Sequence, residues 1–258
     1  MSKPRILILR APGTNCDAET AYAFQCAGGL PEVVHLNRWL ESPQLAANFQ
    51  ILCIPGGFSY GDDVAAGRIF ANKIRHHLSD VMREFCDAGK LVLGICNGFQ
   101  VLIKSGILDT DDGQGPTASL TWNDSGCYVA RWVHLRKTND KCVFLAGIED
   151  AFLPIAHAEG KFVTRDAESF AQLESAEQLV LRYCPQPENG CRIAEPYNPN
   201  GAVGDVAGMC DKTGRVLGLM PHPERFIDPT QHPQWTRMPE RPAGGGLHVF
   251  RNGVRYFS

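Results

Sequence analysis

The sequence lacks any long apolar segment. No apolar run approaches the ~18 residues with which a helix crosses a bilayer, and Ile6–Leu9 is too short to form the core of a secretory signal peptide. The sequence therefore excludes a membrane-spanning protein and predicts a cytoplasmic one. Its length of 258 residues and its hydrophobic content of 44% fit one α/β domain over residues 1–258.

The sequence also lacks the patterns of a nucleic-acid-binding protein and of a metal site. Its net charge is −3, and no dense cluster of Lys and Arg alternates with aromatic residues. It has ten cysteines but no C-x-x-C pair, so we expect mostly free thiols in a reducing cytosol and no bound metal. The pair His76-His77 lies among charged residues, which is typical of a solvated helix face.

Strand and helix patterns alternate through the first hundred residues and return near the C-terminus. Apolar segments predict strands at Arg5–Leu9, Pro31–Leu36, Phe49–Ile54, Leu91–Ile95 and Arg215–Met220. Helices are predicted at Cys16–Ala27, Ile69–Ala88, 97–105 and Leu247–Tyr256. This alternation predicts an α/β fold with a doubly wound, mostly parallel sheet flanked by helices, in which ligands bind at the carboxyl ends of the strands.

The second half of the chain adds loops and strands to this core. Its composition predicts a polar loop at Asp109–Pro116, a strand at Tyr128–Leu135 and an exposed turn at Cys184–Gly190. The Pro- and Gly-rich tail Pro229–Gly246 is predicted to be irregular. No internal repeat and no long linker indicates a second domain.

A candidate nucleophile lies in the segment Gly94-Ile95-Cys96-Asn97-Gly98. The segment follows the apolar run Leu91–Leu93 and precedes a second one at Phe99–Ile103, so Cys96 falls between a strand and a helix. Glycine two residues to either side allows the sharp turn of a nucleophile elbow, here with cysteine in the place of serine. A helix N-terminus favours the thiolate form, which makes Cys96 the predicted nucleophile.

A candidate base lies far downstream, in Pro221-His222-Pro223-Glu224. Residues two apart in extended backbone point the same way, so His222 and Glu224 are both expected to face one site. His222 then serves Cys96 as base and Glu224 orients the imidazole. The alternative is a simple turn after a strand, and the presence of the Cys96 elbow favours the catalytic interpretation.

An acyl-enzyme also needs donors for the oxyanion. The amide of Asn97, directly after the nucleophile, is one candidate. Gly56-Gly57-Phe58 follows the strand Phe49–Ile54, and Gly57 is our candidate for the second amide because glycine lets bare backbone approach a substrate. The alternative is that these glycines only form a turn.

Together these segments resemble a class I, triad-type glutamine amidotransferase and, more narrowly, the glutaminase subunit of phosphoribosylformylglycinamidine synthase of purine biosynthesis. The resemblance spans nearly the whole chain through six motifs in order: Pro12–Asp17, Pro55–Asp62, Gly94–Gln100, Ala156–Gly160, Tyr197–Gly201 and Pro221–Arg225. A lone Gly-x-Cys-x-Gly would be weak support, whereas the six ordered motifs are strong.

The resemblance implies that Cys96 attacks the side-chain amide of L-glutamine, and that water then hydrolyses the thioester intermediate. The released ammonia passes to a large synthetase subunit, which aminates formylglycinamide ribonucleotide using ATP and Mg. A small accessory subunit is a further expected partner. This chain has no G-x-x-x-x-G-K-[ST] motif, since Gly89-Lys90 is followed by Leu91, so ATP is expected on the partner and no cofactor on this chain.

The resemblance also implies further site residues. Gly56, Phe58 and Gln100 lie in the matching motifs and are expected to contact the substrate, while His157 and Glu159 are expected near the pocket or the partner surface. The chain departs from the compact subunit in having extra length at 109–123, 184–191 and 229–246. It also carries Ala202 where serine is expected.

Two other functions remain open at this point. One is a stand-alone hydrolase with the same Cys-His-Glu residues, which the long motif Gly56–Asp62 disfavours. The other is a non-catalytic regulatory module, which the intact Cys96, His222 and Glu224 disfavour.

Overall fold

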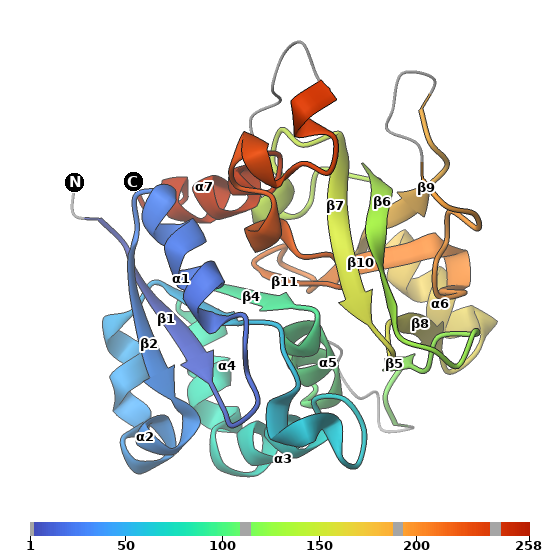
Figure 1. Cartoon of the computed structure of the whole chain (residues 1–258). Helices are drawn as coiled ribbons and strands as arrows, with labels where there is room; N and C mark the ends of the chain where they lie inside the picture. Colours follow the sequence, from blue (N-terminus) through green and yellow to red (C-terminus); the bar gives the residue numbers. More distant parts are fainter. Residues whose placement is uncertain (1–2, 109–114, 188–192, 238–243) are drawn as a thin grey trace.

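A computed structural model describes residues 3–108, 115–187, 193–237 and 244–258 (Figure 1). Their main feature is a nine-stranded sheet with the order β2-β1-β3-β4-β11-β10-β9-β6-β7. The strands are β1 (Arg5–Arg10), β2 (Leu30–His35), β3 (Ile51–Ile54), β4 (Leu91–Ile95), β6 (Val129–Lys137), β7 (Asp150–His157), β9 (Leu179–Cys184), β10 (Val206–Cys210) and β11 (Val216–Leu219). A separate two-stranded ribbon joins β5 (Ala118–Thr121) to β8 (Lys161–Thr164).

One half of the sheet is parallel and forms the predicted α/β core. The pairs β2–β1, β1–β3, β3–β4 and β4–β11 are all parallel. Every residue of β3, β4 and β11 is buried, as expected for strands covered by helices on both faces. The predicted α/β fold, with a large sheet flanked by helices, is confirmed.

The other half extends the sheet in antiparallel fashion. The strands β10, β9, β6 and β7 follow β11 in that order, each antiparallel to its neighbour. Only β6 matches a predicted strand in this half; β5, β7, β8, β9 and β10 were not predicted. The sequence predicted inserted strands in this half of the chain but gave the position of only one of them.

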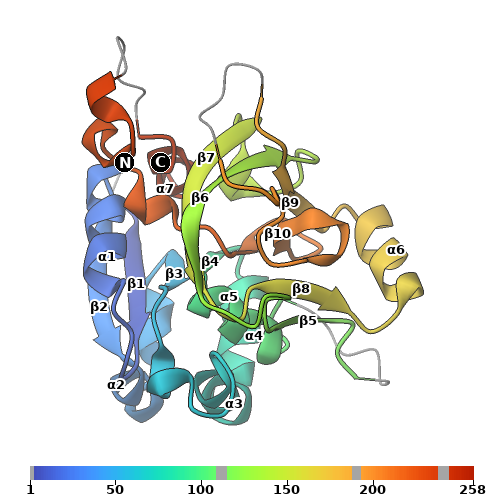
Figure 2. The ribbon, with the colours of Figure 1, turned by 45° about the vertical axis from the view of Figure 1, so that its right-hand side comes forward.

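Helices cover both faces of the parallel strands. The helices around these strands are α1 (Asp17–Cys26), α2 (Leu36–Glu41), α3 (Arg68–His77), α4 (Ser79–Asp87), α5 (Asn97–Lys104) and α7 (Leu247–Arg255), while α6 (Ala167–Ser175) lies beside β8 in the antiparallel half. In both views α1 and α7 lie on one side, and α3, α4 and α5 lie on the other (Figures 1 and 2). This arrangement follows from right-handed crossovers, because the chain steps from β1 to β2 in one direction and from β3 to β4 in the other.

The predicted single helix Ile69–Ala88 is wrong, because α3 and α4 are separate. Leu78 between them leaves the helical region with φ −130° and ψ 7°. The Leu78 side chain is completely buried in the core. The break at this residue lets each helix pack its own apolar face against the sheet. The pattern looked continuous because both helices are amphipathic.

The predicted second strand ends one residue early, at His35, and the helix α2 that follows was missed. The His35 ring accepts a hydrogen bond from the Asn37 amide at 3.1 Å, so this side chain caps the helix and ends the strand. The other predicted strands and helices of the first half agree with the structure to within about two residues at each end.

Three predicted loops fall partly outside the described residues. These are 109–114 of the polar loop, 188–190 of the turn and 238–243 of the tail. The described part of the tail forms short 3₁₀ turns at Pro229–Gln231 and Trp235–Arg237. None of the described helices is long and apolar enough to span a bilayer. The nine described cysteines are all free thiols.

Candidate active site

Cys96 sits on a strained turn between β4 and α5. Its φ of 51° and ψ of −104° are unusual for any residue with a side chain, and such strain is typical of a nucleophile elbow. The flanking glycines are required by space. A Cβ on Gly94 would come within 2.7 Å of the Gly98 carbonyl, and a Cβ on Gly98 would overlap the Ile54 carbonyl oxygen. Both glycines are therefore needed for close packing, whereas the sharp turn that they were predicted to allow is made by Cys96 itself.

The sulfur of Cys96 faces a cavity at the carboxyl end of the parallel strands. Cys96 is 5% exposed and directly precedes α5, whose N-terminus carries a partial positive charge. In the resting geometry Sγ lies 3.7 Å from the carbonyl oxygen of Ala156, at the end of β7. The antiparallel half of the sheet thus forms the opposite wall of the nucleophile's site.

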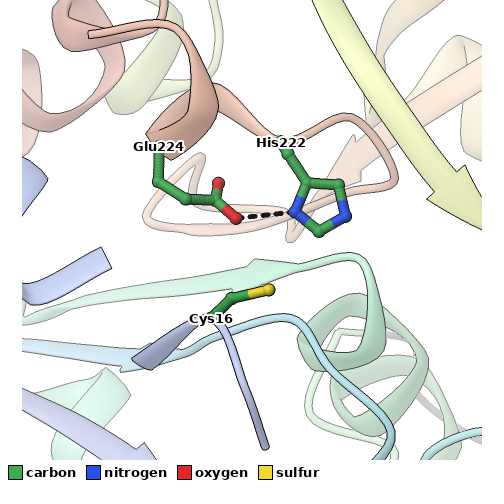
Figure 3. Close-up of side chains that lie close together, drawn as sticks. All are labelled: Cys16, His222 and Glu224. Atoms are coloured by element: carbon green, nitrogen blue, oxygen red, sulfur yellow. Dashed lines mark hydrogen bonds and ion pairs between the residues drawn. The ribbon is translucent and has the colours of Figure 1, made fainter. Parts of the chain in front are cut away.

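His222 is brought to Cys96 by strand pairing. Leu219 of β11 lies in register with Ile95 of β4, so the residues that follow the two strands emerge side by side at one edge of the sheet. His222 and Glu224 are 2% and 1% exposed. Nδ1 of His222 lies 2.6 Å from Oε1 of Glu224 (Figure 3). The sequence argument expected extended backbone here, whereas Pro223–Arg225 forms a 3₁₀ turn that returns the carboxylate to the imidazole.

The Glu224 contact fixes the chemistry of the imidazole. A carboxylate accepts from Nδ1–H, which leaves Nε2 as the nitrogen that exchanges a proton with a substrate or nucleophile. Nε2 is buried and has no hydrogen-bond partner among the described residues. Burial favours the neutral ring, but the nearby charges of Glu224 and Cys96 raise the pKa of His222 well above its usual value.

The two candidate oxyanion donors lie on either side of Cys96. Asn97 is the first residue of α5, where helix amides lack intrahelical partners. Gly57 lines the same cavity as Cys96 and has a φ of 140°; a Cβ there would come within 2.7 Å of the Asn15 amide. Glycine is therefore needed at position 57 for both backbone conformation and space.

The side chains of Asn97 and Gln100 tie the loop after β3 to the end of β7. Asn97 accepts from the Ser59 amide at 3.2 Å and donates to Asp62 at 3.1 Å and to Gln100 Oε1 at 2.9 Å. Gln100 in turn donates to the carbonyl of Glu159 at 2.6 Å. This network presets the shape of the pocket before any substrate arrives.

The motif Pro12–Asp17, which had no assigned role, supports the same loop. The Phe58 amide donates to the Gly13 carbonyl at 3.0 Å, and the Tyr60 amide donates to the Pro12 carbonyl at 2.7 Å. Tyr60, Gly61 and Asp62 all have positive φ, between 54° and 71°. These bonds stabilise the strained turn at the mouth of the site.

The cavity beside Cys96 has a volume of about 230 Å³. It is lined by Gly57, Phe58, Gly61, Asp62, Ala66, Cys96, Gln100, Trp122, Ala156, His157, Ala158 and Glu159. Of the three predicted substrate contacts, Phe58 and Gln100 line the cavity, whereas Gly56 packs against the His222 ring. Trp122 was not predicted, since a tryptophan in an inserted segment carries no pattern that points to this pocket.

His157 is buried in the cavity wall as a neutral imidazole. Its Nδ1 lies 3.2 Å from Oδ1 of Asn123. Burial first, and the nearby charge of His222 second, lower its pKa to about 3. His157 therefore carries no charge near neutral pH. Glu159 next to it accepts from the Ala66 amide at 3.1 Å and pairs with Lys104 at 3.6 Å.

The motif Tyr197–Gly201 holds this wall from behind. Asn200 is 1% exposed and donates to the carbonyl of Gly160 at 2.7 Å. The motif thus positions the segment 157–160 and does not reach the cavity, and the substitution by Ala202 lies in this supporting layer.

Cys16 is a further residue of the site that the sequence argument missed. It is 1% exposed, and its Sγ, a nitrogen of His222 and an oxygen of Glu224 all lie within 4.8 Å of one another (Figure 3). Among the described residues this is the one group of three side chains with metal-ligating atoms so close together. The Arg225 guanidinium, which donates to Sγ at 3.2 Å, adds a positive charge that opposes a metal cation there.

A second, larger cavity of about 590 Å³ adjoins the first and shares Trp122 and Glu159 with it. Arg68, Arg75 and Lys104 give it a positive lining. It contains none of the triad-like residues, so it is a neighbour of the site and not the place of the chemistry.

Comparison with known proteins agrees with this geometry. A family model described as a CobB/CobQ-like glutamine amidotransferase domain matches residues 3–257. Phosphoribosylformylglycinamidine synthase subunit PurQ from Dehalococcoides mccartyi is 44% identical, and the subunit of the same name from Methanococcus maripaludis is 42% identical. Each alignment covers 99% of this chain and 98% of the relative. The chain belongs to the PurQ family of glutamine amidotransferases.

The PurQ match extends to three dimensions. A chain of the solved structure of PurLQS from Thermotoga maritima superposes with a TM-score of 0.75 at 30% identity, and the superposition covers 100% of both chains. The antiparallel strands and ribbon of the second half are therefore part of a fold shared with this relative and not an addition peculiar to this chain.

Proposed function

We propose that this chain is the glutaminase subunit of phosphoribosylformylglycinamidine synthase. It hydrolyses glutamine through a thioester on Cys96 and delivers ammonia to a synthetase, which converts formylglycinamide ribonucleotide to formylglycinamidine ribonucleotide with consumption of ATP. The observation that carries the proposal is the buried His222–Glu224 pair, held beside Cys96 by the register of β11 on β4. The names of the full-length relatives support the choice of reaction.

The geometry supports a defined order of proton transfers. Nε2 of His222 takes the proton of Cys96, whose sulfur attacks the side-chain carbonyl of glutamine. The amides of Gly57 and Asn97 stabilise the negative oxygen of the tetrahedral intermediate. The imidazolium then gives its proton to the departing nitrogen, and ammonia leaves. Water, deprotonated by the same nitrogen, hydrolyses the thioester and releases glutamate while Glu224 keeps Nδ1–H in place.

The partner supplies the second half of the reaction. The structural relative from Thermotoga maritima belongs to an assembly named PurLQS, which supports a large synthetase and a small subunit as partners of this chain. The sequence carries no phosphate-loop motif, so we place ATP and Mg on the synthetase. We propose that the chain works as one glutamine amidotransferase domain in the cytoplasm, with Phe58 and Gln100 in contact with the substrate and Gly56 shaping the site from beneath His222.

The decisive experiment measures glutamate release from glutamine with and without the synthetase, ATP and the nucleotide substrate. We expect the partner to stimulate release and Cys96→Ala to abolish it, while synthesis with added ammonia continues in the complex. Cys26→Ala, which removes an exposed thiol on α1, is the matched control and should keep full activity. Glutamate release by Cys96→Ala would refute the assigned nucleophile, and equal release without the partner would favour a stand-alone hydrolase.

A further inference from the structure

The buried thiol of Cys16 has no part in the proton transfers above, yet it lies against the groups that perform them. Cys16 ends the turn after β1, directly before α1, and Figure 3 shows its sulfur pointing toward the His222–Glu224 pair. A Cβ on Gly56 would come within 2.7 Å of His222 Cε1 and 3.2 Å of Cys16 Sγ. The imidazole and the sulfur are thus packed together over Gly56, with no spare volume.

The sulfur also contacts a cation that could disturb the pair. Nη2 of Arg225 donates to Sγ at 3.2 Å, and Nε of the same guanidinium donates to Oε1 of Glu19 at 3.0 Å. Cys16 and Glu19 therefore share the hydrogen-bonding edge of Arg225. This edge lies near the catalytic carboxylate, because the sulfur that it contacts is within 4.8 Å of a Glu224 oxygen.

Glu224 offers Arg225 an unused acceptor. Its second oxygen, Oε2, is buried and has no hydrogen-bond partner in the part of the chain that the structure describes. No ion pair joins Glu224 to Arg225 within the described residues. A guanidinium prefers to bind a carboxylate through two parallel hydrogen bonds, so an Arg225 free to move would compete with His222 for Glu224.

We propose that Cys16 is a positioning residue of the glutaminase, which holds Arg225 on Glu19 and thereby reserves Glu224 for His222. This inference rests on the proposed function. The sulfur accepts an N–H of Arg225 at 3.2 Å and lies within 4.8 Å of a Glu224 oxygen, so it stands beside both the cation and the carboxylate. Burial raises the pKa of the Cys16 thiol, so the sulfur adds no charge of its own beside the imidazole.

The titratable and charged groups near His222 come from several elements. Its titratable and charged neighbours are Glu224 and Arg225 on its own turn, Cys16 before α1, Cys96 after β4, Tyr128 before β6 and His157 at the end of β7. The Glu224 carboxylate is the largest of those that raise the pKa of His222. If Arg225 engaged that carboxylate, the pKa of His222 would fall, and the imidazolium would lose its proton at lower pH.

The test compares Cys16→Ala with Cys16→Ser in the complex with the synthetase. We expect Cys16→Ala to lower kcat about tenfold with little change in KM, and to move the alkaline limb of the pH–rate profile to lower pH. Cys16→Ser keeps an acceptor of similar size and should retain near-normal values. Cys142→Ala removes an equally buried sulfur away from the site and should leave the profile unchanged.

A double variant makes the test specific to Arg225. Adding Arg225→Met to Cys16→Ala removes the competing cation, so it should return kcat and the alkaline limb toward the wild-type values. A double variant no better than Cys16→Ala would overturn the proposal, as would a Cys16→Ala profile that matches Cys142→Ala.

A second measurement separates this proposal from the proposed function. The rate at which iodoacetamide alkylates Cys96, followed by mass spectrometry of its peptide across pH, reports the thiolate–imidazolium pair without any glutaminase turnover. We expect Cys16→Ala to shift this profile and the double variant to restore it. If the wild type showed no turnover but Cys16→Ala still shifted the alkylation profile, the proposed glutaminase function would be refuted and the proposal for Cys16 would stand.

Discussion

Cys96, His222 and Glu224 each depend on one residue that has no chemistry of its own. Gly98 lets α5 pack closely against β3, Gly56 leaves room for the His222 imidazole, and Pro223 begins the 3₁₀ turn that brings Glu224 back. The reactive groups were predictable because their residue types and spacing are distinctive. Cys16 was not, because a cysteine in a turn looks the same whether it faces solvent or a catalytic pair.

Replacing Glu224 tests the source of the His222 pKa. Glu224→Gln keeps the side chain's shape but removes the negative charge that raises this pKa, so the imidazolium should lose its proton at lower pH. We expect kcat to fall by roughly 10²-fold, less than for Cys96→Ala or His222→Ala, because an orienting group is more dispensable than a nucleophile or base. The alkaline limb of the pH–rate profile should move to lower pH.

The matched control for this experiment is Glu168→Gln, an exposed position on α6. It removes the same charge far from the catalytic pair and should leave the profile in place. An unmoved alkaline limb in Glu224→Gln would mean that another group sets the proton affinity of His222.

Among the helices and strands, some are determined by their local sequence and others by their packing against the rest of the fold. The parallel strands β3, β4 and β11 were predictable because each is a short, continuously buried apolar segment, as at Leu91–Ile95. Of the antiparallel strands only β6 was predicted, since a strand such as β7 mixes buried with half-buried and exposed residues and depends on its neighbours for pairing. The break at Leu78 was missed for a related reason: tertiary burial, and not local sequence, decides it.

At this scale Gly98→Ala tests the packing of α5 on β3. Its Cβ would overlap the Ile54 carbonyl oxygen, so the helix must move away from the strand or the turn must open. We expect a loss of about 1–3 kcal/mol in the free energy of unfolding, measured by urea denaturation. Gly245→Ala is the matched control, because its Cβ would meet only ordinary contacts at 3.5 Å. Equal stabilities for the two variants would contradict the steric requirement.

At the scale of the whole molecule, exposed aromatic side chains surround the mouth of the site. Phe58, Trp122 and Tyr128 are 42%, 57% and 50% exposed, and Phe58 and Tyr128 lie 6.3 Å apart between ring centroids. Exposed aromatic residues around a reactive cavity are typical of a protein interface. Because ammonia must reach the synthetase without loss to water, this rim is where we expect the partner to close the site.

Trp122→Ala tests the rim. We expect it to weaken the complex with the synthetase by roughly 30-fold in Kd, the effect of losing about 2 kcal/mol at an aromatic hot spot. Tyr22→Ala on α1 removes an equally exposed aromatic ring, at 60%, that lines neither cavity, and should not change the Kd. Titration of the synthetase by calorimetry measures both. An unchanged Kd for Trp122→Ala would move the docking surface elsewhere.

The register of β11 on β4 has a consequence for the synthesis of the protein on the ribosome. Ile95 and Leu219 are neighbours in the sheet although more than a hundred residues separate them in the chain. Closing so long a loop is entropically unfavourable until both halves have formed, so we expect this pairing to form late in folding. A ribosome therefore makes the nucleophile first and the base nearly last. Throughout most of synthesis the growing chain carries Cys96 without His222, and an unfinished subunit cannot consume glutamine before it is able to meet its synthetase.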